Sequence, residues 1–314
     1  MNFLSHIYGG VVGARNALYD RDLLRARRLS GTVVSVGNVS AGGSGKTPFV
    51  ILLGELLKVR GIPFDVLSRG YGRRTRGVLL VDTAGTSGQF GDEPILMARR
   101  LQVPVIVGED RYKAGQFAEA NFGAQMHLLD DGFQHRALAR DFDIVLVTPQ
   151  DAKDSLLPGG RLREPLQSLR RADAIVLASG ASAESFPVQG KPIWRVRRGI
   201  VPGNIPLRPV VFCGVARPEN FVLQLRAANI EPAAQAFYRD HRAYTETDVR
   251  ELLALRERSE AGGFVTTEKD AVNLGGYLSA LDPLAVVPVK MELADAANAL
   301  DTMLRMIAER RASA

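Results

Sequence analysis

The sequence contains almost no cysteine and no long apolar run, and each absence excludes a class of protein. Cys213 is the single cysteine among 314 residues, which excludes a disulfide framework and a cysteine-rich zinc site. No apolar stretch approaches the roughly 18 residues that span a bilayer. The first residues lack a basic start, and Gly9, Gly10 and Gly13 interrupt the apolar segment, so a secretory signal is not expected. We therefore expect an intracellular protein that does not cross a membrane.

Aromatic residues are also scarce, at 7%, while hydrophobic residues make up 46% and charged residues 24% of the chain. These proportions are ordinary for a soluble globular protein and exclude disordered, collagen-like and coiled-coil proteins. At roughly 100–200 residues per domain, the length indicates about two domains. The formal net charge of +6 favours anionic partners such as phosphorylated substrates, nucleic acid or an anionic membrane surface.

Residues 1–28 are predicted to form an amphipathic helix with a basic end. Its apolar residues recur at helical spacing, at Leu4, Ile7, Tyr8, Val11, Val12 and Leu18. Its basic residues are Arg15, Arg21, Arg25, Arg27 and Arg28. Two interpretations remain open at this point. The helix either packs on the protein core or lies in a membrane interface with its basic end on lipid phosphates.

Short apolar runs alternate with helical patterns along most of the chain, as in a parallel sheet covered on both faces. The predicted strands of the first part are Thr32–Val36, Phe64–Ser68, Val78–Val81, Pro104–Val107, Met126–Leu129, Ile144–Val147 and Ala174–Leu177. The fold class predicted from this alternation is α/β, a parallel sheet with helices on both faces.

A change of pattern near residues 180–209, where prolines and glycines cluster, indicates a domain boundary. We expect a larger α/β domain over 29–190 and a smaller α/β domain over 209–283. Segments 191–208 and 284–292, which alternate apolar and charged residues, are predicted to pair as a two-stranded hinge. Residues 293–314 are predicted to form a C-terminal helix that packs back on the large domain.

A glycine-rich hexapeptide follows the first predicted strand and opens a helix. It reads Gly42-Gly43-Ser44-Gly45-Lys46-Thr47. Glycines allow the backbone N–H groups to surround a phosphate, and the helix start adds positive potential. Lys46 would reach the β- and γ-phosphates of a nucleotide, and the hydroxyl of Thr47 would bind Mg²⁺. The usual pattern has a glycine where this chain has Ser40, which is its one departure. The segment makes the predicted α/β sheet one of the P-loop NTPase type, and it predicts a nucleoside triphosphate and Mg²⁺ as ligands without saying which chemistry they serve.

Two adjacent carboxylates, Asp130 and Asp131, end a predicted buried strand. Carboxylates at this position bind Mg²⁺ or orient its water shell in P-loop enzymes. The alternative is a turn at Asp131-Gly132, which aspartate and glycine both favour.

Further short segments accompany these two. They are Gly37-Asn38, Ser68-Arg69-Gly70-Tyr71-Gly72, Gly91-Asp92-Glu93-Pro94, Asp130-Asp131-Gly132-Phe133-Gln134-His135, Leu162-Arg163-Glu164-Pro165, Asp240-His241 and Thr266-Thr267-Glu268-Lys269-Asp270. Together they closely resemble the tetraacyldisaccharide 4′-kinase family, the lipid A kinases of Gram-negative bacteria. The resemblance covers about residues 1–292.

The resemblance implies transfer of the γ-phosphate of ATP to the 4′-hydroxyl of a tetraacylated glucosamine disaccharide 1-phosphate. The acceptor lies in the cytoplasmic face of the inner membrane, so the protein is expected there as a peripheral enzyme. This favours the interfacial interpretation of the N-terminal helix. The partners expected are the acylated disaccharide and the membrane, with no nucleic acid and no obligate protein partner.

The resemblance also assigns the catalytic residues. Asp92 matches the proposed base and His241 its partner, while Lys46 belongs to the phosphate loop. An aspartate is a weak base on its own, with a pKa near about 4, and a neighbouring group can orient it and tune its proton affinity. The alternatives are a helix N-terminal role for Asp92 ahead of Pro94 and a surface histidine in a polar turn.

Other polar residues of these segments are assigned less sharply. Gln134 and His135 are placed at the nucleotide or sugar, or order the turn. Glu93 is placed near the metal, or supports the first helical turn. The candidates for contact with the acceptor are Arg69, Arg73, Arg74 and Arg163. For Arg69 the alternative is an ion pair that shapes the loop, and for Arg73 and Arg74 it is a solvated loop. For Arg163 the alternative is a pair with Glu164. Lys269 and Asp270 belong to the pattern, but the sequence gives no mechanism for them.

Two other functions compete with the lipid kinase. A P-loop nucleotide switch or metallochaperone-like ATPase acting on a protein partner would use Lys46, Thr47 and Asp130, but would not need Asp92 and His241 to converge. A kinase for a water-soluble sugar would not need residues 1–28.

Overall fold

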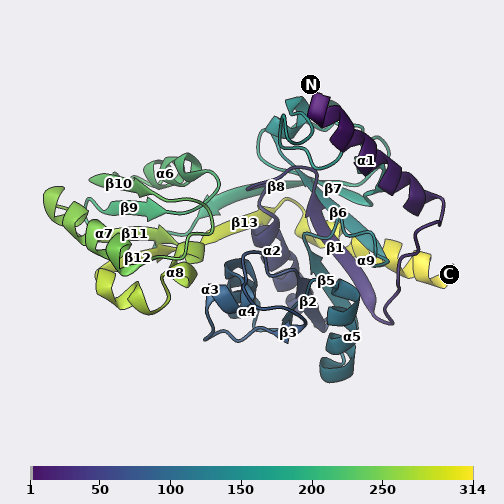
Figure 1. The fold of residues 1–314 in the computed structure, drawn as a ribbon, viewed down its shortest axis with the longest axis horizontal. Helices are drawn as coiled ribbons and strands as arrows, with labels where there is room; N and C mark the ends of the chain where they lie inside the picture. Colours follow the sequence, from purple (N-terminus) through teal and green to yellow (C-terminus); the bar gives the residue numbers. More distant parts are fainter. Residues whose placement is uncertain (1–2, 314) are drawn as a thin grey trace.

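The computed structural model describes residues 3–313, so Met1, Asn2 and Ala314 of the predicted terminal helices lie outside the described residues. The chain forms a large lobe and a small lobe joined by a two-stranded ribbon (Figure 1). Each lobe is built on its own sheet, which matches the α/β architecture predicted from the alternation of short apolar runs and helical patterns.

The sheet of the large lobe has nine strands within the described residues, in the order β13-β8-β7-β6-β1-β5-β2-β4-β3. The seven from β8 to β4 are parallel, and β3 and β13 are antiparallel edge strands. Their bounds are β1 Thr32–Asn38, β2 Phe64–Ser68, β3 Leu79–Leu80, β4 Val105–Val107, β5 Met126–Asp130, β6 Phe142–Val147, β7 Ala174–Leu177, β8 Ile193–Ile200 and β13 Val289–Leu293.

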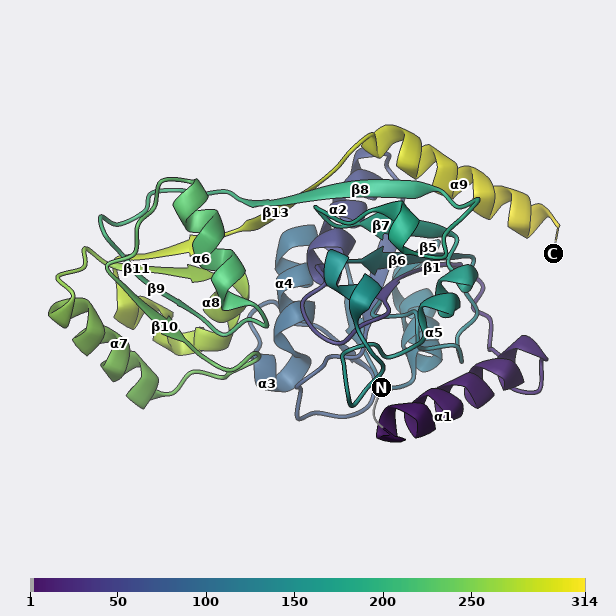
Figure 2. The same cartoon turned by 90° about the horizontal axis from the view of Figure 1, so that it is seen from above.

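Helices cover both faces of this sheet, so its central strands are buried along their whole length. One face carries α2 (Lys46–Val59), α4 (Asp92–Leu101) and α9 (Ala296–Ala312). The other face carries α5 (Arg111–Phe122) and the 3₁₀ turns Pro149–Lys153, Leu166–Arg171 and Ala183–Ser185. The long helices α1 (Phe3–Asp20) and α9 lie on opposite sides of the lobe (Figure 2). The short α3 (Ser87–Phe90) precedes α4.

The small lobe has a four-stranded parallel sheet within the described residues, in the order β10-β9-β11-β12. The strands are β9 Val210–Cys213, β10 Ala234–Phe237, β11 Phe264–Thr267 and β12 Leu284–Val287. The helices are α6 Pro218–Ala227, α7 Glu246–Arg258 and α8 Glu268–Leu274, followed by a 3₁₀ segment at Gly275–Leu281.

The hinge consists of β8 and β13, which run antiparallel along the edge of the large sheet. The sequence analysis predicted one hinge strand over 284–292, but the structure divides this segment. Leu284–Val287 belongs to the small sheet, where it pairs with β11, and the hinge strand begins at Val289. Pro288 separates the two strands, since it has no N–H group to continue a ladder.

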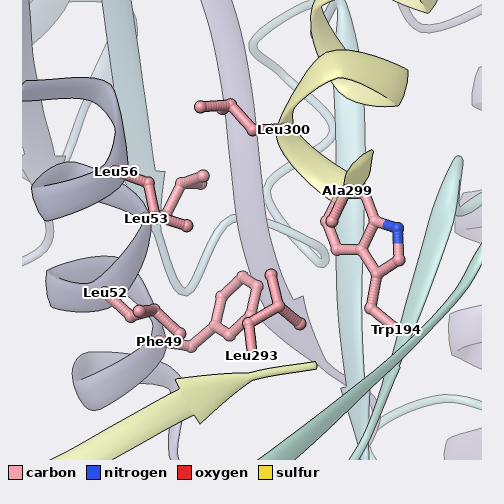
Figure 3. A pocket seen from close by; sticks show the side chains of 8 residues that line it. All are labelled: Phe49, Leu52, Leu53, Leu56, Trp194, Leu293, Ala299 and Leu300. Carbon is pink, nitrogen blue, oxygen red and sulfur yellow. The ribbon is translucent and has the colours of Figure 1, made fainter. Parts of the chain in front are cut away.

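The hinge is attached to the helix that follows the phosphate loop. Figure 3 shows Trp194 of β8 and Leu293 of β13 beside Phe49 of α2 and Ala299 of α9, around a small apolar void. The indole of Trp194 also stacks on the ring of Phe142, with centroids 6.1 Å apart. The base of the hinge is therefore fixed in the core of the large lobe.

Helix α1 is shorter than the sequence predicted, because it ends at Asp20 instead of residue 28. Asp22 has a left-handed backbone (φ 55°), and the chain then runs irregularly to a bridge between Arg27 and Leu138. Arg28 forms an ion pair with the buried Asp141. The arginines after Asp20 therefore lie in a segment tied to the large lobe instead of on a continuing helix.

The contribution of α9 to stability is testable at Met303, which is fully buried against the large sheet. We expect Met303→Ala to lower the free energy of unfolding by about 2–5 kcal/mol, because it removes buried apolar volume. Urea unfolding followed by circular dichroism measures this change. Met306→Ala, on the partly buried flank of the same helix, is the control and should cost clearly less. Equal losses for the two variants would contradict the packing described here.

Candidate active site

The sequence-predicted site residues gather where the carboxyl ends of the two sheets face each other. In the large lobe, β1, β2 and β5 end at Asn38, Ser68 and Asp130. A loop of the small lobe, which follows β9, reaches the same place. Its Ala216 lies close to Gly43 of the large lobe: a Cβ atom built on Gly43 would be 3.4 Å from Cβ of Ala216. Ligands of open α/β sheets bind at these strand ends.

The phosphate loop connects β1 to α2. Gly42 and Gly45 have φ values of 86° and 88°, which only glycine adopts at low cost, and they turn the chain around the position of a phosphate. Gly45 is the last residue before α2, so the helix starts at this loop. Lys46 and Thr47 form the first turn of α2, and Thr47 is buried. All six residues predicted from the hexapeptide thus lie in the loop or the first turn.

Asn38 holds this loop in shape, a role that the sequence analysis did not assign. Its buried amide nitrogen donates to the carbonyl of Ser40 at 2.6 Å and to Oγ of Ser44 at 2.8 Å. Its Oδ1 accepts a hydrogen bond from Nζ of Lys46 at 3.0 Å, and its backbone carbonyl accepts one from Nε2 of Gln134 at 2.8 Å. One side chain therefore positions both the loop and the lysine.

The two carboxylates at the end of β5 have different surroundings. Asp130 is buried, and one oxygen accepts a hydrogen bond from the hydroxyl of Ser68 at 3.0 Å. Burial and the negative charges of Glu93 and Asp131 raise the pKa of Asp130 to about 7. Asp131 instead forms ion pairs with Arg163 at 2.8 Å and Lys46 at 3.5 Å. Burial raises the pKa of Asp131, but these cations more than offset it and the net shift is downward.

The residues predicted to bind Mg²⁺ fit a site that shares the ion with a nucleotide. Within residues 3–313, no three acidic, histidine or cysteine side chains converge as a complete cage. Mg²⁺ commonly uses one or two protein carboxylates together with phosphate oxygens and waters. Oδ1 of Asp130 is buried without a hydrogen-bond partner among the described residues, as expected for an oxygen that faces a cation. Asp130 is therefore the carboxylate whose surroundings best fit a metal ligand, while Thr47, Asp131 and Glu93 remain predictions.

Asp92 and His241 meet across the interface of the two lobes, although 149 positions separate them in sequence. Asp92 is the first residue of α4, and His241 follows β10 with a left-handed backbone (φ 60°). Nδ1 of His241 lies 3.0 Å from each carboxylate oxygen of Asp92, so this nitrogen carries a proton that it donates. The ring of Tyr71 packs beside that of His241, with centroids 5.0 Å apart.

Asp92 receives enough donors to stay ionised despite being only 3% exposed. Burial alone would raise the pKa of Asp92, but the hydrogen bond from His241 and the charge of Lys269 produce a net lowering. Burial would lower the pKa of His241, whereas the carboxylate of Asp92 produces a net rise. The pair is thus an ionised aspartate that accepts a hydrogen bond from an oriented imidazole.

Lys269 and Asn273, both on α8, complete the surroundings of Asp92. Nδ2 of Asn273 donates to Oδ2 of Asp92 at 3.0 Å, and Nζ of Lys269 lies 3.8 Å from the same oxygen. The sequence analysis gave Lys269 no mechanism and did not single out Asn273. Their spacing, i and i+4 on one helix, is the signal that could have grouped them.

Gln134 and His135 lie in the turn after β5. Gln134 donates to the backbone of Asn38, so it supports the phosphate loop. Burial and the positive charges of Arg111 and Arg140 lower the pKa of His135 to about 4, which keeps this ring neutral. Its Nε2 is buried without a hydrogen-bond partner among the described residues.

The four arginines predicted to contact the acceptor have different surroundings. Arg163 binds both oxygens of Asp131, at 2.8 and 3.0 Å, and not Glu164, which pairs with Arg171 instead. Arg73 is buried and bonded to Glu109 at 2.7 Å and to the carbonyl of Gly77. These contacts favour a loop-shaping role for Arg73.

Arg69 and Arg74 are exposed in the segment that follows β2. Arg111, a buried arginine that the sequence analysis missed, lies close to Arg69. Burial and the charge of Arg69 lower the pKa of Arg111, and its Nε has no hydrogen-bond partner within the described chain. Arg69 and Arg111 therefore form a positive region beside the site.

We expect Asn38→Ala to weaken ATP binding about tenfold, which corresponds to about 1.4 kcal/mol, because the loop and Lys46 lose their shared anchor. The free energy of unfolding should fall by about 1–3 kcal/mol, since buried polar groups lose their partners. Calorimetric titration with ATP and urea unfolding measure the two effects. Asn220→Ala, on the exposed surface of α6, is the control. Unchanged ATP affinity in Asn38→Ala would exclude this role.

Known proteins match this chain over nearly its whole length. The family model of tetraacyldisaccharide-1-P 4′-kinase (LpxK) matches residues 1–308. The tetraacyldisaccharide 4′-kinase of Koribacter versatilis is 48% identical, over 99% of this chain and 100% of that protein. The corresponding protein of Aquifex aeolicus is 38% identical, over 87% and 89% of the two chains.

The crystal structure of the "apo" form of LpxK from Aquifex aeolicus in complex with ATP has a TM-score of 0.79 to this structure. It is 34% identical and covers 97% of each chain. The resemblance and the fold class expected from the sequence are thereby confirmed. The chain belongs to the tetraacyldisaccharide-1-P 4′-kinase family, and it is a kinase and not a nucleotide switch.

Proposed function

We propose that this chain transfers the γ-phosphate of ATP to the 4′-hydroxyl of a tetraacylated disaccharide 1-phosphate at the cytoplasmic face of the inner membrane. Asp92 is the base that accepts the hydroxyl proton, and His241 orients it. Lys46 stabilises the charge that develops on the transferred phosphoryl group. The observation that carries this proposal is the convergence of Asp92 and His241 from two lobes beside a phosphate loop.

The position of Asp92 relative to the metal carboxylate supports its role. Glu93, the next residue, lies near enough to Asp130 for its charge to raise the pKa of that carboxyl group. The proposed base is therefore adjacent to the residues that would hold Mg²⁺ and the phosphates. Phosphoryl transfer depends on such positioning and on neutralised charge more than on covalent chemistry by the protein.

The acceptor also carries a 1-phosphate, which needs cationic contacts. Arg69 and Arg111 form a positive region next to the metal carboxylates, and Arg74 lies exposed in the neighbouring loop. A guanidinium group binds phosphate oxygens through two parallel hydrogen bonds. We assign the acceptor, or its phosphate, to this region. Arg163 is a weaker candidate for contact with the acceptor, since its guanidinium already binds Asp131.

Helix α1 provides the proposed contact with the membrane. Its exposed face carries a stripe of apolar side chains, at Phe3, Leu4, Ile7, Val11 and Leu18. Within residues 3–313, none of the helices combines the length and hydrophobicity needed to cross a bilayer. An interfacial helix buries such a stripe at the level of the headgroups and the first acyl carbons.

Polar contacts hold this helix beside the catalytic residues. Tyr8 donates to the carbonyl of Arg163 at 3.1 Å, and Arg15 donates to the carbonyl of Gln134 at 2.7 Å. Gly9 permits close approach, because a Cβ atom there would lie 2.8 Å from Leu156. A membrane bound by the apolar stripe would therefore present its lipids next to the site.

We expect Asp92→Asn to reduce product formation by about 100-fold or more, because general-base catalysis contributes about that much. The assay combines protein, Mg-ATP and detergent-dispersed tetraacyldisaccharide 1-phosphate, and mass spectrometry measures the gain of one phosphoryl group. ATP binding should persist in this variant. Asp301→Asn, at an exposed surface ion pair, is the control. Wild-type turnover in Asp92→Asn would remove Asp92 from the mechanism, and no lipid product from the wild type would reject the proposed function.

We expect the double variant Ile7→Asp/Val11→Asp to bind vesicles containing anionic lipid at least about tenfold more weakly, a loss of about 1.4 kcal/mol or more. These side chains are 50% and 65% exposed, so their removal should not disturb folding. Vesicle co-sedimentation measures binding, and activity on detergent-dispersed acceptor should persist. Leu223→Asp, exposed on α6, is the control. Unchanged vesicle binding would exclude α1 as the membrane contact.

A further inference from the structure

Lys269 lies at the boundary between the lobes, and neither the fold nor the proposed roles explain it. It is in the first turn of α8 in the small lobe, and its side chain is only 15% exposed. Withdrawing an ammonium group from water is unfavourable unless nearby groups compensate its charge. The surroundings of its Nζ therefore indicate what the residue does.

Three carboxylates surround this ammonium group. Oδ1 of Asp240 accepts its hydrogen bond at 2.9 Å, Oε1 of Glu93 lies at 3.7 Å, and Oδ2 of Asp92 lies at 3.8 Å. Burial lowers the pKa of Lys269, but these three charges more than offset it, with a net rise. Asp240 belongs to the small lobe, whereas Asp92 and Glu93 belong to the large lobe. The ammonium group of Lys269 thus attracts carboxylates of both lobes, and one of them is the proposed base, Asp92.

Lys269 also contacts the residue that orients the base. Its Nζ lies 3.3 Å from Nε2 of His241, on the opposite side of the ring from Asp92. The imidazole is therefore held between Asp92 at Nδ1 and Lys269 at Nε2. With the side chain of Asn273, the small lobe directs three groups onto one carboxylate of the large lobe.

The next residue, Asp270, fixes the backbone that carries Lys269. It is fully buried, and it accepts hydrogen bonds from the N–H of Gly214 at 2.7 Å and from the hydroxyl of Tyr244 at 2.8 Å. The hydroxyl of Thr267 also donates to it. Gly214 begins the loop whose Ala216 lies against the phosphate loop. Asp270 therefore joins the turn bearing Lys269 to the segment that touches the nucleotide-binding loop.

We propose that Lys269 is a positioning residue that clamps the small lobe onto Asp92 and holds His241 in its orienting position, so that closure of the lobes assembles the base. The inference rests on the proposed function, because it assigns Lys269 to the same reaction. Lys269 acts through Asp92 and His241, the two groups of the proposed base that its ammonium group approaches. Asp270 supports it by fixing the start of α8.

The first test compares Lys269→Met, which keeps the length of the side chain, with Lys269→Arg, which keeps the charge. With saturating Mg-ATP and detergent-dispersed acceptor, we expect Lys269→Met to reduce kcat about tenfold or more, because misplacement of a base by about 1 Å is costly. The KM for ATP should change by less than about threefold, since the phosphate loop is intact. Lys269→Arg should recover much of the lost kcat. Lys290→Met, on the exposed face of β13, is the control.

The second test measures closure without relying on activity. Val59 in the large lobe and Leu223 in the small lobe are exposed, so cysteines there accept spin labels, while the native Cys213 is fully buried. With a non-hydrolysable ATP analogue, electron–electron resonance should give a narrow distance distribution for the wild type. In Lys269→Met the distribution should broaden towards longer distances, and in Lys269→Arg it should stay narrow.

Wild-type kcat in Lys269→Met, no recovery in Lys269→Arg, or an unchanged distance distribution would each overturn the proposal. If Lys269→Met does not fold, Asp240→Ala removes the nearest partner of the ammonium group from a partly exposed position. We expect a reduced kcat there too, and a wild-type value would equally reject the clamp. Absence of lipid product from the wild type would reject the proposed function instead, and the distance measurement would still decide whether Lys269 holds the lobes together.

Discussion

The organisation of this molecule depends on one buried negative charge, the carboxylate of Asp92. A charge in this position is costly unless donors surround it, and among residues 3–313 the hydrogen bond that the large lobe supplies comes from the N–H of Glu93. The other donors, His241 and Asn273, come from the small lobe, together with the charge of Lys269. The small lobe therefore supplies most of the polar contacts that stabilise the ionised carboxylate of Asp92, and these contacts favour the arrangement of the lobes seen here.

The two sheets are arranged to meet this requirement. The small sheet and the seven strands from β8 to β4 of the large sheet are parallel, so the loops after these strands emerge at one edge of each sheet, and the two edges face each other. The phosphate loop, Asp130, Asp131 and Asp92 belong to the large lobe, while His241 and Lys269 belong to the small lobe. The base of the hinge is packed on α2 through Trp194 and Leu293, so the ribbon that joins the lobes is anchored on the helix that begins at the phosphate loop.

Much of this architecture was predictable because strands and phosphate loops leave local signals. Phe64–Ser68 and Ala174–Leu177 were predicted with the bounds that the structure shows, since each is a short segment rich in apolar residues between helical patterns. The hinge strand was misplaced, because the pattern of residues 284–292 is continuous and only pairing partners divide it. In the site, Asp92 and His241 were assigned by resemblance. Asn38, Arg111, Lys269 and Asn273 were not assigned, because their roles depend on neighbours distant in sequence or on burial that no local pattern reports.

The contact between Gly43 and Ala216 has a consequence for the timing of the reaction cycle. The small lobe rests on the loop that would hold the nucleotide phosphates. If a nucleotide binds beneath this contact, ADP would leave and fresh ATP would enter only when the lobes separate. Every turnover then includes one opening, and interactions that assemble the catalytic groups also delay nucleotide exchange. The cluster around Asp92 is consequently subject to two opposing demands, and an interface that held the lobes much more tightly would retain its product and turn over more slowly.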